Sequence, residues 1–221
     1  GTEAPMSVPT KARTNEQNIQ FDSANDYADL DCVKGSIDED KGTISLWVRP
    51  LPQELNPTTS VVSIAADDNN MIEILYVGHS SAPVFRGVYR GGGSQKTIDS
   101  GVVTPGSWVH IAMTWNTTGD ILKLYMDSNE TTVSTLPDFS GSIARVYLGA
   151  KASSGGAEDF FLGKMDEIAF FGEILTPVQI GEIDVNQSIG ITGLSSYADL
   201  DHYFRIDAIP YFSPYTQGIV D

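Results

Sequence analysis

The stretch that most constrains this chain is residues 107–127, SWVHIAMTWNTTGDILKLYMD. Two runs in it place an apolar residue at every second position, and Asn-Thr-Thr-Gly-Asp separates them. The apolar members of the two runs are Val109, Ile111, Met113, Trp115, Leu122, Leu124 and Met126. A period of two is typical of a strand with one buried face, and the intervening residues are typical of a turn. The stretch therefore predicts a β-hairpin.

A hairpin with one apolar face needs a second sheet to bury that face. Short segments of the same kind recur along the chain, and the gaps between them hold Gly and Pro. A length of 221 residues is enough for the core of one large domain. We therefore predict an all-β protein, an antiparallel two-sheet β-sandwich, with one short helix near the C-terminal side. Thr176 is a suitable N-cap for this helix, and Pro177 suits its first turn.

The chain divides into three predicted parts. Residues 1–17 are polar and contain two prolines, which is typical of an arm or linker. The sandwich domain is expected over residues 18–187. Residues 188–221 are expected to add a C-terminal strand, near residues 202–207, and a tail that packs on the same domain.

The charge of the chain excludes some classes of partner. The formal net charge is -16, with 13 Lys and Arg against 29 Asp and Glu. Contacts to phosphate need clustered Lys and Arg, so we expect neither a nucleic-acid partner nor binding to anionic membranes. No apolar run approaches the roughly 18 residues of a membrane span, so membrane insertion is not expected. Cys32 is the single cysteine, which excludes a disulfide within the chain.

Three stretches, in this order and spacing, resemble laminin-G-like and pentraxin-like domains of the concanavalin A-like superfamily. The first is residues 42–50, GTISLWVRP, which resemble an early core strand. The second is the hairpin of residues 107–127, and the third is residues 163–183, which resemble a late strand and a short closing helix. The resemblance runs from about residue 18 to residue 183 and implies a jelly-roll topology. It does not select a function, because this fold hosts lectins, glycosidases, lyases and adhesion modules.

Oxygen-bearing side chains gather at a predicted hairpin tip. They are Asp67, Asp68, Asn69 and Asn70. Calcium takes about six to eight oxygen ligands, so this tip is a candidate calcium site. Asp and Asn also favour tight turns, which leaves a turn without a metal as the alternative.

The resemblance to pentraxins bears on this calcium site. In those proteins an Asp-Asn pair at the corresponding hairpin is completed by a later acidic loop, and Asp68-Asn69 match the pair. Here the later loop is KASSGGAEDF, which begins at Lys151 and offers Glu158 or Asp159 as an acidic ligand. The predicted metal ligands are therefore Asp67, Asp68, Asn69 and Asp159, and the departure at Lys151 argues against the paired-calcium site of pentraxins.

Strand parity predicts a second candidate site, for carbohydrate. The residues that alternate with the core positions are Trp47, Arg49, His110, Lys123 and Tyr125. Aromatic rings flanked by hydrogen-bond donors hold sugars by stacking on their apolar faces. The alternative is that loops, the C-terminal segment or a partner cover this face, so that the aromatic residues only pack.

We expect a non-catalytic, lectin-like module that binds a carbohydrate or glycoconjugate, with calcium as a candidate cofactor. It would work outside the cell or on the surface of a cell or particle. One alternative is a structural adhesion or assembly module of a larger surface protein. The other is a polysaccharide hydrolase or lyase, although Glu182-Ile-Asp184 lacks the third carboxylate of the glucanase motif and lies in the predicted helix.

Overall fold

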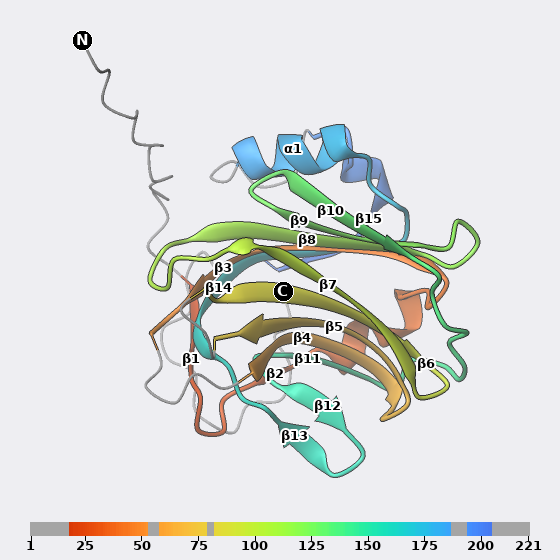
Figure 1. The fold of residues 1–221 in the computed structure, drawn as a ribbon, viewed down its shortest axis with the longest axis horizontal. Coiled ribbons are helices and arrows are strands. Elements are labelled where there is room, and N and C mark those ends of the chain that lie inside the picture. The colour runs from red at the N-terminus through yellow and green to blue at the C-terminus, as the bar shows by residue number, and fades with distance from the viewer. Residues whose placement is uncertain (1–17, 53–57, 79–81, 187–193, 205–221) are drawn as a thin grey trace.

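The computed structural model confirms the predicted β-sandwich (Figure 1). It describes residues 18–52, 58–78, 82–186 and 194–204. Two antiparallel sheets lie one above the other, and a short helix covers the outer side of one of them. Of the predicted tail regions, residues 1–17 and 205–221 lie outside the described residues, so the predicted domain boundaries stay predictions.

The first sheet, sheet A, has the strand order β1-β14-β3-β8-β9-β10, and β15 also pairs with β14. Its strands are β1 (Ile19–Asp22), β3 (Lys41–Pro50), β8 (Val109–Asn116), β9 (Ile121–Met126), β10 (Asn129–Ser134), β14 (Leu162–Phe171) and β15 (Leu200–Phe204). The predicted central hairpin is β8 and β9, with Met113 opposite Leu124. The strands β1 and β15 share one edge of β14 and pair with different halves of it.

The second sheet, sheet B, has the strand order β2-β11-β4-β5-β6-β7. Its strands are β2 (Ala28–Asp29), β4 (Thr58–Asp67), β5 (Asn70–Val77), β6 (Val84–Gly91), β7 (Ser94–Val102) and β11 (Arg145–Leu148). Two short strands, β12 (Lys151–Ser153) and β13 (Gly156–Glu158), pair with each other below sheet B (Figure 1). A 3-10 turn, η1 (Asp31–Ser36), follows β2.

The core lies between the two sheets. Sheet A contributes Ile44, Leu46 and Met113 among others, and sheet B contributes Ile72 and Ile74. These residues follow the predicted alternation, so the predicted parity of β3, β8 and β9 is confirmed. Parity matters because a slip of one residue would exchange the two faces of a strand.

The predicted helix is α1 (Pro177–Val185), and its cap forms as expected. The Thr176 hydroxyl accepts a hydrogen bond from the backbone nitrogen of Gln179, and the Gln179 side-chain oxygen accepts one from the backbone nitrogen of Thr176. After α1, a second 3-10 turn, η2 (Tyr197–Asp199), leads into β15. Within the described residues no helix is long and apolar enough to cross a membrane.

The predicted loop of residues 151–158 is instead the hairpin β12–β13. Gly149, just before it, has φ of +79°, and a Cβ there would lie 2.4 Å from the Phe21 ring. The Gly149 backbone nitrogen donates to the Val61 carbonyl, and the Gly149 carbonyl accepts from the Phe161 backbone nitrogen. These two hydrogen bonds fix the chain where it reverses direction after β11. This reversal lets the chain leave β11 and fold β12–β13 back over the outer face of sheet B.

Trp115 gives a test of the core. Its ring is buried between the sheets, and its indole nitrogen donates to the Asp38 carbonyl at 3.0 Å. We expect Trp115→Ala to lower the free energy of unfolding by about 3–5 kcal/mol, the usual range for a buried aromatic truncated to alanine. Urea denaturation measures this. The control Val102→Ala, on an exposed residue, should change it by less than about 0.5 kcal/mol, and equal losses for both variants would contradict the packing.

Candidate functional site

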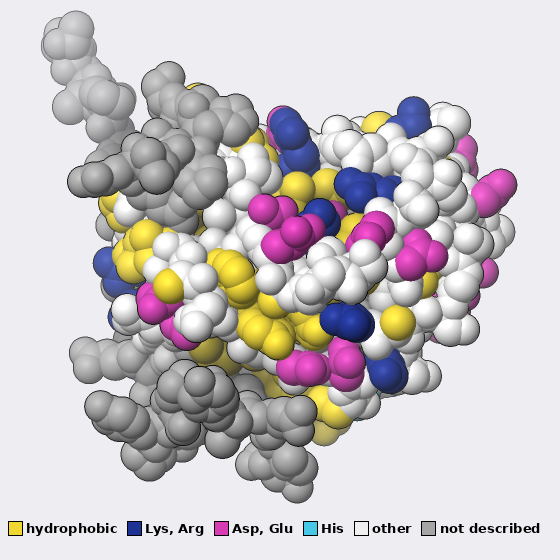
Figure 2. Space-filling view, turned by 90° about the horizontal axis from the view of Figure 1, so that it is seen from below, with side chains coloured by type: hydrophobic (Ala, Val, Ile, Leu, Met, Phe, Trp, Pro, Cys, Tyr) yellow, Lys and Arg dark blue, Asp and Glu magenta, His cyan; other side chains and the backbone are white. Residues whose placement is uncertain are grey.

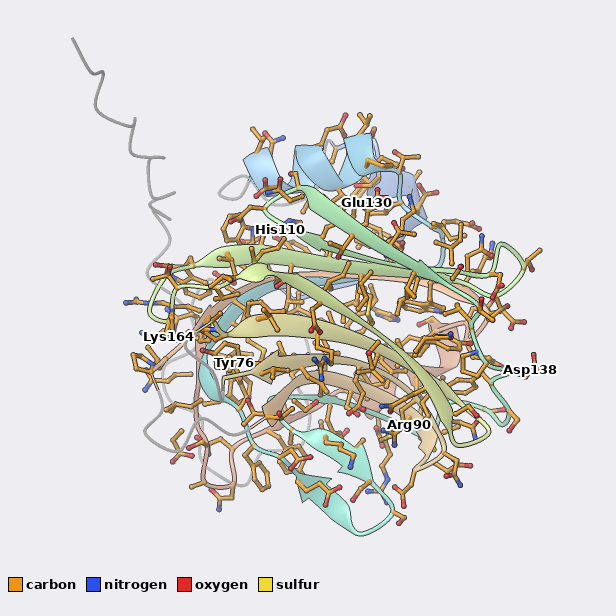
Figure 3. The ribbon with its side chains drawn as sticks, viewed as in Figure 1. Tyr76, Arg90, His110, Glu130, Asp138 and Lys164 are labelled. Carbon is orange, nitrogen blue, oxygen red and sulfur yellow. The ribbon has the colours of Figure 1, made fainter. Side chains whose placement is uncertain are left out.

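The outer face of sheet A does not provide the exposed platform that the sequence predicted. Trp47, His110 and Tyr125 point away from the core as expected, but all three are buried, Trp47 with only 1% of its surface exposed. Trp47 lies opposite His110, with ring centroids 5.6 Å apart, and the His110 ring is 2.8 Å from the Ser45 hydroxyl. Figure 3 shows His110 on the side of sheet A that carries α1. The predicted exposure of Trp47 and Tyr125 is therefore wrong.

The reason is a second apolar layer built by the C-terminal elements. Tyr125 packs in a cluster with Ile180 and Ile183 of α1, and Leu200 and Tyr203 of β15 join its border. The face is therefore covered, as the alternative predicted, but mainly by α1, and the predicted C-terminal segment contributes Leu194, Leu200 and Tyr203 at the border.

The remaining two residues of the predicted carbohydrate site have other partners. The Arg49 guanidinium donates to the carbonyl of Gly106. The Lys123 ammonium forms an ion pair with Glu130 at 2.9 Å. The register brings neither of them directly opposite Trp47 or Tyr125, although all five predicted residues share one face.

The predicted calcium ligands at residues 67–70 form a hydrogen-bonded turn. The Asp67 carboxylate accepts from the backbone nitrogen of Asn69 at 2.8 Å and from the Asn70 side chain at 2.9 Å. The buried Asn70 oxygen accepts from the backbone nitrogens of Gly92 and Ser140, which ties the turn to its neighbours. These contacts fit the tight-turn alternative.

The structure does bring the later loop to this turn, as the resemblance implied. The Asp68 carboxylate accepts hydrogen bonds from the backbone nitrogen and the hydroxyl of Ser154, at the tip of β12–β13. These bonds lower the pKa of Asp68 below its ordinary value. Asp159 is exposed, and its backbone carbonyl accepts from Ser60. Within residues 18–52, 58–78, 82–186 and 194–204, no group of three or more His, Cys, Asp or Glu is placed to hold a metal ion.

The outer face of sheet B collects polar side chains that the sequence analysis did not single out. Residues directly opposite in a sheet point to the same side, so the register sorts the outward residues into rows. The rows are Arg145, Ala65, Met71, Arg90 and Gln95; then Asp29, Tyr147, Ser63, Glu73, Val88 and Thr97; then Ser60, Leu75, Arg86 and Asp99. Figure 2 views the molecule from this side and shows basic and acidic side chains interspersed with apolar patches.

The hairpin β12–β13 covers one half of this face. Ala152 packs with Ala65, Met71 and Tyr147, and its backbone nitrogen donates to the Ser63 hydroxyl at 3.1 Å. The strands β6 and β7 on the other half are not covered in this way by β12–β13. Among the described residues, the outer face of sheet B therefore has a half over β11, β4 and β5 that this hairpin covers and a half over β6 and β7 that it leaves uncovered, called here the open half.

The open half carries planar polar groups. The Arg86 guanidinium contacts both Asp99 carboxylate oxygens, at 2.6 and 2.8 Å. Arg90, labelled in Figure 3, donates to the Gln95 side chain at 2.8 Å and to the Asp68 carbonyl at 2.9 Å. Val88 lies between the two arginines along β6 and is buried. Planar groups of this kind form paired hydrogen bonds.

Glu73 lies where the covered and open halves meet. It is opposite Ser63 on one side and Val88 on the other, and only 2% of its surface is exposed. Burial raises the pKa of Glu73 to about 7, while the charges of Arg90 and Lys151 act in the opposite direction. Lys151 itself forms an ion pair with Glu158 across the hairpin at 2.7 Å. A carboxyl that can change charge near neutral pH thus lies under β12–β13.

The alternation of β6 held the signal that the sequence analysis missed. Arg86, Val88 and Arg90 alternate with Phe85 and Tyr89, which are buried. That pattern predicts a strand with one face carrying cations, in a chain that is otherwise strongly acidic. The position of Glu73 beside them depends on strand pairing, which no local pattern reveals.

Comparison with known proteins agrees with the fold. The family model of the concanavalin A-like lectin/glucanases superfamily matches residues 22–181. The carbohydrate-binding module CBM40 of the IT-sialidase from Ruminococcus gnavus is similar in structure, with a TM-score of 0.62, 14% identity and coverage of 76% of this chain and 97% of the module. The same module is also known bound to α2,3-sialyllactose. A heptameric SAP-like pentraxin from Limulus polyphemus matches with a TM-score of 0.55, 16% identity and 91% coverage of both chains. No curated protein sequence matches the chain.

Glu73 makes stability depend on pH. The folded protein holds the Glu73 proton more tightly than the unfolded chain, so this contribution to stability is complete below about pH 4.5 and is lost as the pH rises to about 7. Each pH unit between the two pKa values is worth about 1.4 kcal/mol, so the loss amounts to about 3 kcal/mol. We expect Glu73→Gln to remove this pH dependence. Between these pH values the free energy of unfolding of the variant should therefore rise relative to that of the wild type, and above them the difference should stay constant.

Urea unfolding of both proteins from about pH 4 to about pH 8 measures this gap. Glu173→Gln, at an exposed carboxylate paired with Lys41, is the matched control and should follow the wild type at every pH. Parallel curves for wild type and Glu73→Gln would contradict the burial of a titrating carboxyl at this position.

A variant of Asp68 distinguishes a hydrogen-bonded turn from a calcium site at residues 67–70. Because the Asp68 carboxylate accepts two hydrogen bonds from Ser154, we expect Asp68→Ala to lower the melting temperature equally in calcium and in a chelator. A ligand that binds only the folded state stabilises it by mass action. A calcium-induced rise of the wild-type melting temperature that Asp68→Ala abolishes would therefore identify the calcium site predicted from the sequence.

Proposed function

The chain belongs to the concanavalin A-like lectin/glucanase superfamily, and on this basis we propose that it is a non-catalytic carbohydrate-binding module. We propose that it binds its ligand on the outer face of sheet B. The observation that carries the proposal is the contrast between the two outer faces. That of sheet A is covered by α1, with side chains of β15 at the border, whereas that of sheet B presents the open half over β6 and β7.

The chemistry of the open half suits a sugar. Sugars offer hydroxyl groups that planar guanidinium, carboxylate and amide groups bind in pairs. Arg86 with Asp99, and Arg90 with Gln95, supply such planar groups on the open half. The structural similarity to a module bound to sialyllactose supports a carbohydrate as the ligand class.

Calcium assistance and an extracellular or surface location remain parts of this proposal. The Asp67–Asn70 turn can stand without an ion, because its side chains are satisfied by Ser154, Gly92 and Ser140. We therefore propose that the open half of sheet B recognises the sugar directly and that the response to calcium is tested separately.

A glycan array with purified protein, in calcium and in a chelator, tests the function. We expect binding to a defined group of glycans and about a tenfold or larger loss of affinity in Arg86→Ala, since a hydrogen bond from a charged group contributes about 1.5–3 kcal/mol. The melting temperature of this variant should hardly change, because Arg86 and Asp99 form an exposed pair.

Lys41→Ala is the matched control, because Lys41 forms a similarly exposed ion pair with Glu173 away from sheet B. It should bind glycans as the wild type does. A protein that binds no glycan under either condition would overturn the proposal and favour the assembly-module alternative. Release of shorter oligosaccharides from a bound polysaccharide would overturn the non-catalytic assignment.

A further inference from the structure

Three aromatic rings meet at the edge of sheet B, on the same face as the open half. The Tyr27 ring, next to β2, lies 4.8 Å from the Tyr147 ring of β11 and 6.4 Å from the Phe160 ring, between centroids. Tyr147 is buried, so it supports Tyr27 from below. One side of the Tyr27 ring is thus held against two other rings.

Tyr27 is exposed although it has this support. Within the described residues, the aromatic side chains among the exposed large hydrophobic residues are Tyr27, at 43%, and Tyr197, at 50%. Both begin a copy of the same pentapeptide, Tyr-Ala-Asp-Leu-Asp, at residues 27–31 and 197–201. The second copy lies on the other side of the molecule, where Asp199 accepts a hydrogen bond from Gln179 of α1. The same local sequence therefore presents a tyrosine on each outer face, and among the described residues it is Tyr27 of the two that packs against other aromatic rings.

Polar groups flank the supported ring. Arg145 donates from Nη1 to the Tyr147 hydroxyl at 3.1 Å, and within the described part of the chain it forms no ion pair. Asp29 lies opposite Tyr147 in the register and accepts from the backbone nitrogen of Asp31 through one carboxylate oxygen. A guanidinium with further N–H donors thus contacts Tyr147, and a carboxylate with further acceptor capacity lies two residues along the chain from Tyr27, so both border the Tyr27–Tyr147 pair.

We propose that Tyr27, braced by Tyr147 and Phe160 and flanked by Arg145 and Asp29, is a stacking subsite for a neutral pyranose. This inference rests on the proposed function and adds a second subsite at the β2 edge of the same face, on the other side of the hairpin β12–β13 from the open half. An aromatic ring fixed from one side and exposed on the other receives the C–H face of a sugar ring without reordering. The flanking donor and acceptor then bind hydroxyl groups at the rim of that sugar.

The ligand class follows from charge. A chain with a net charge of -16 repels anions at long range, and Asp29 adds a local negative charge beside the ring. Arg145 is therefore better matched to hydroxyl groups than to a carboxylate that Asp29 would oppose. A neutral sugar satisfies the donor and the acceptor at once.

The experiment compares wild type, Tyr27→Ala, Tyr27→Phe and Tyr197→Ala on one array of lactose, neutral polysaccharide fragments, α2,3- and α2,6-sialyllactose and uronic-acid oligosaccharides. We expect neutral glycans to bind best. Tyr27→Ala should weaken this binding about tenfold or more, the loss expected for removing an aromatic contact. Tyr27→Phe should retain it, because the stacking ring remains. Tyr197→Ala should equal the wild type, since it removes the similarly exposed tyrosine of the other pentapeptide copy.

The outcomes distinguish the subsite from the function. Wild-type binding that Tyr27→Ala leaves unchanged overturns the subsite and keeps the proposed function. Tyr27-dependent binding of acidic glycans in preference to neutral ones overturns the ligand class and keeps the subsite. An array on which the wild type binds nothing overturns the function and the subsite with it. Melting temperatures of the four proteins separate a lost contact from a lost fold, and a Tyr27→Phe variant that is folded but does not bind overturns the stacking role.

Discussion

The contact between the inward faces of the two sheets determines where every other side chain of this molecule can lie. Residues such as Leu46 and Met113 from sheet A meet Ile72 and Ile74 from sheet B in one continuous core. Because side chains alternate along a strand, fixing these residues inside also fixes which residues point outward. The side chains of Trp47 and Glu73 therefore point outward because their neighbours along the strand point into the core, although an aromatic ring would otherwise favour burial and a carboxyl would favour water.

The two outer faces that result are used differently. The outward residues of β3 and β8 are mostly uncharged, Thr43, Ser45, Ala112 and Thr114 among them, and a second apolar cluster with α1 covers this side. The outward residues of β6 include two arginines, which a packed helix could bury only at a high cost in desolvation. One face thus adds to the core, whereas the other keeps charged and polar side chains over β6 and β7.

The sequence was sufficient for the sandwich, for the parity of its central strands and for the cap of α1, because these depend on local patterns. The sequence was not sufficient to predict which outward side chains are exposed to solvent. Whether Trp47 faces water depends on where α1 and β15 pack, although Ile180 and Ile183 already required an apolar partner. The hairpin β12–β13 was missed because its strands have three residues each, too short to show a period. Without that hairpin, the burial of Glu73 could not be foreseen.

Glu73 shows where the chain departs from the sequence that would be most stable. An uncharged β-branched residue in the middle of β5, opposite Ser63 and Val88, would fill the same space without burying an ionisable group. Arg90 and Lys151 offset part of the cost of that carboxyl, and both belong to elements that border the open half of sheet B. Proteins tend to break local rules of this kind at functional sites. The position of this carboxyl therefore argues, independently of any relative, that the outer face of sheet B is the face shaped by function.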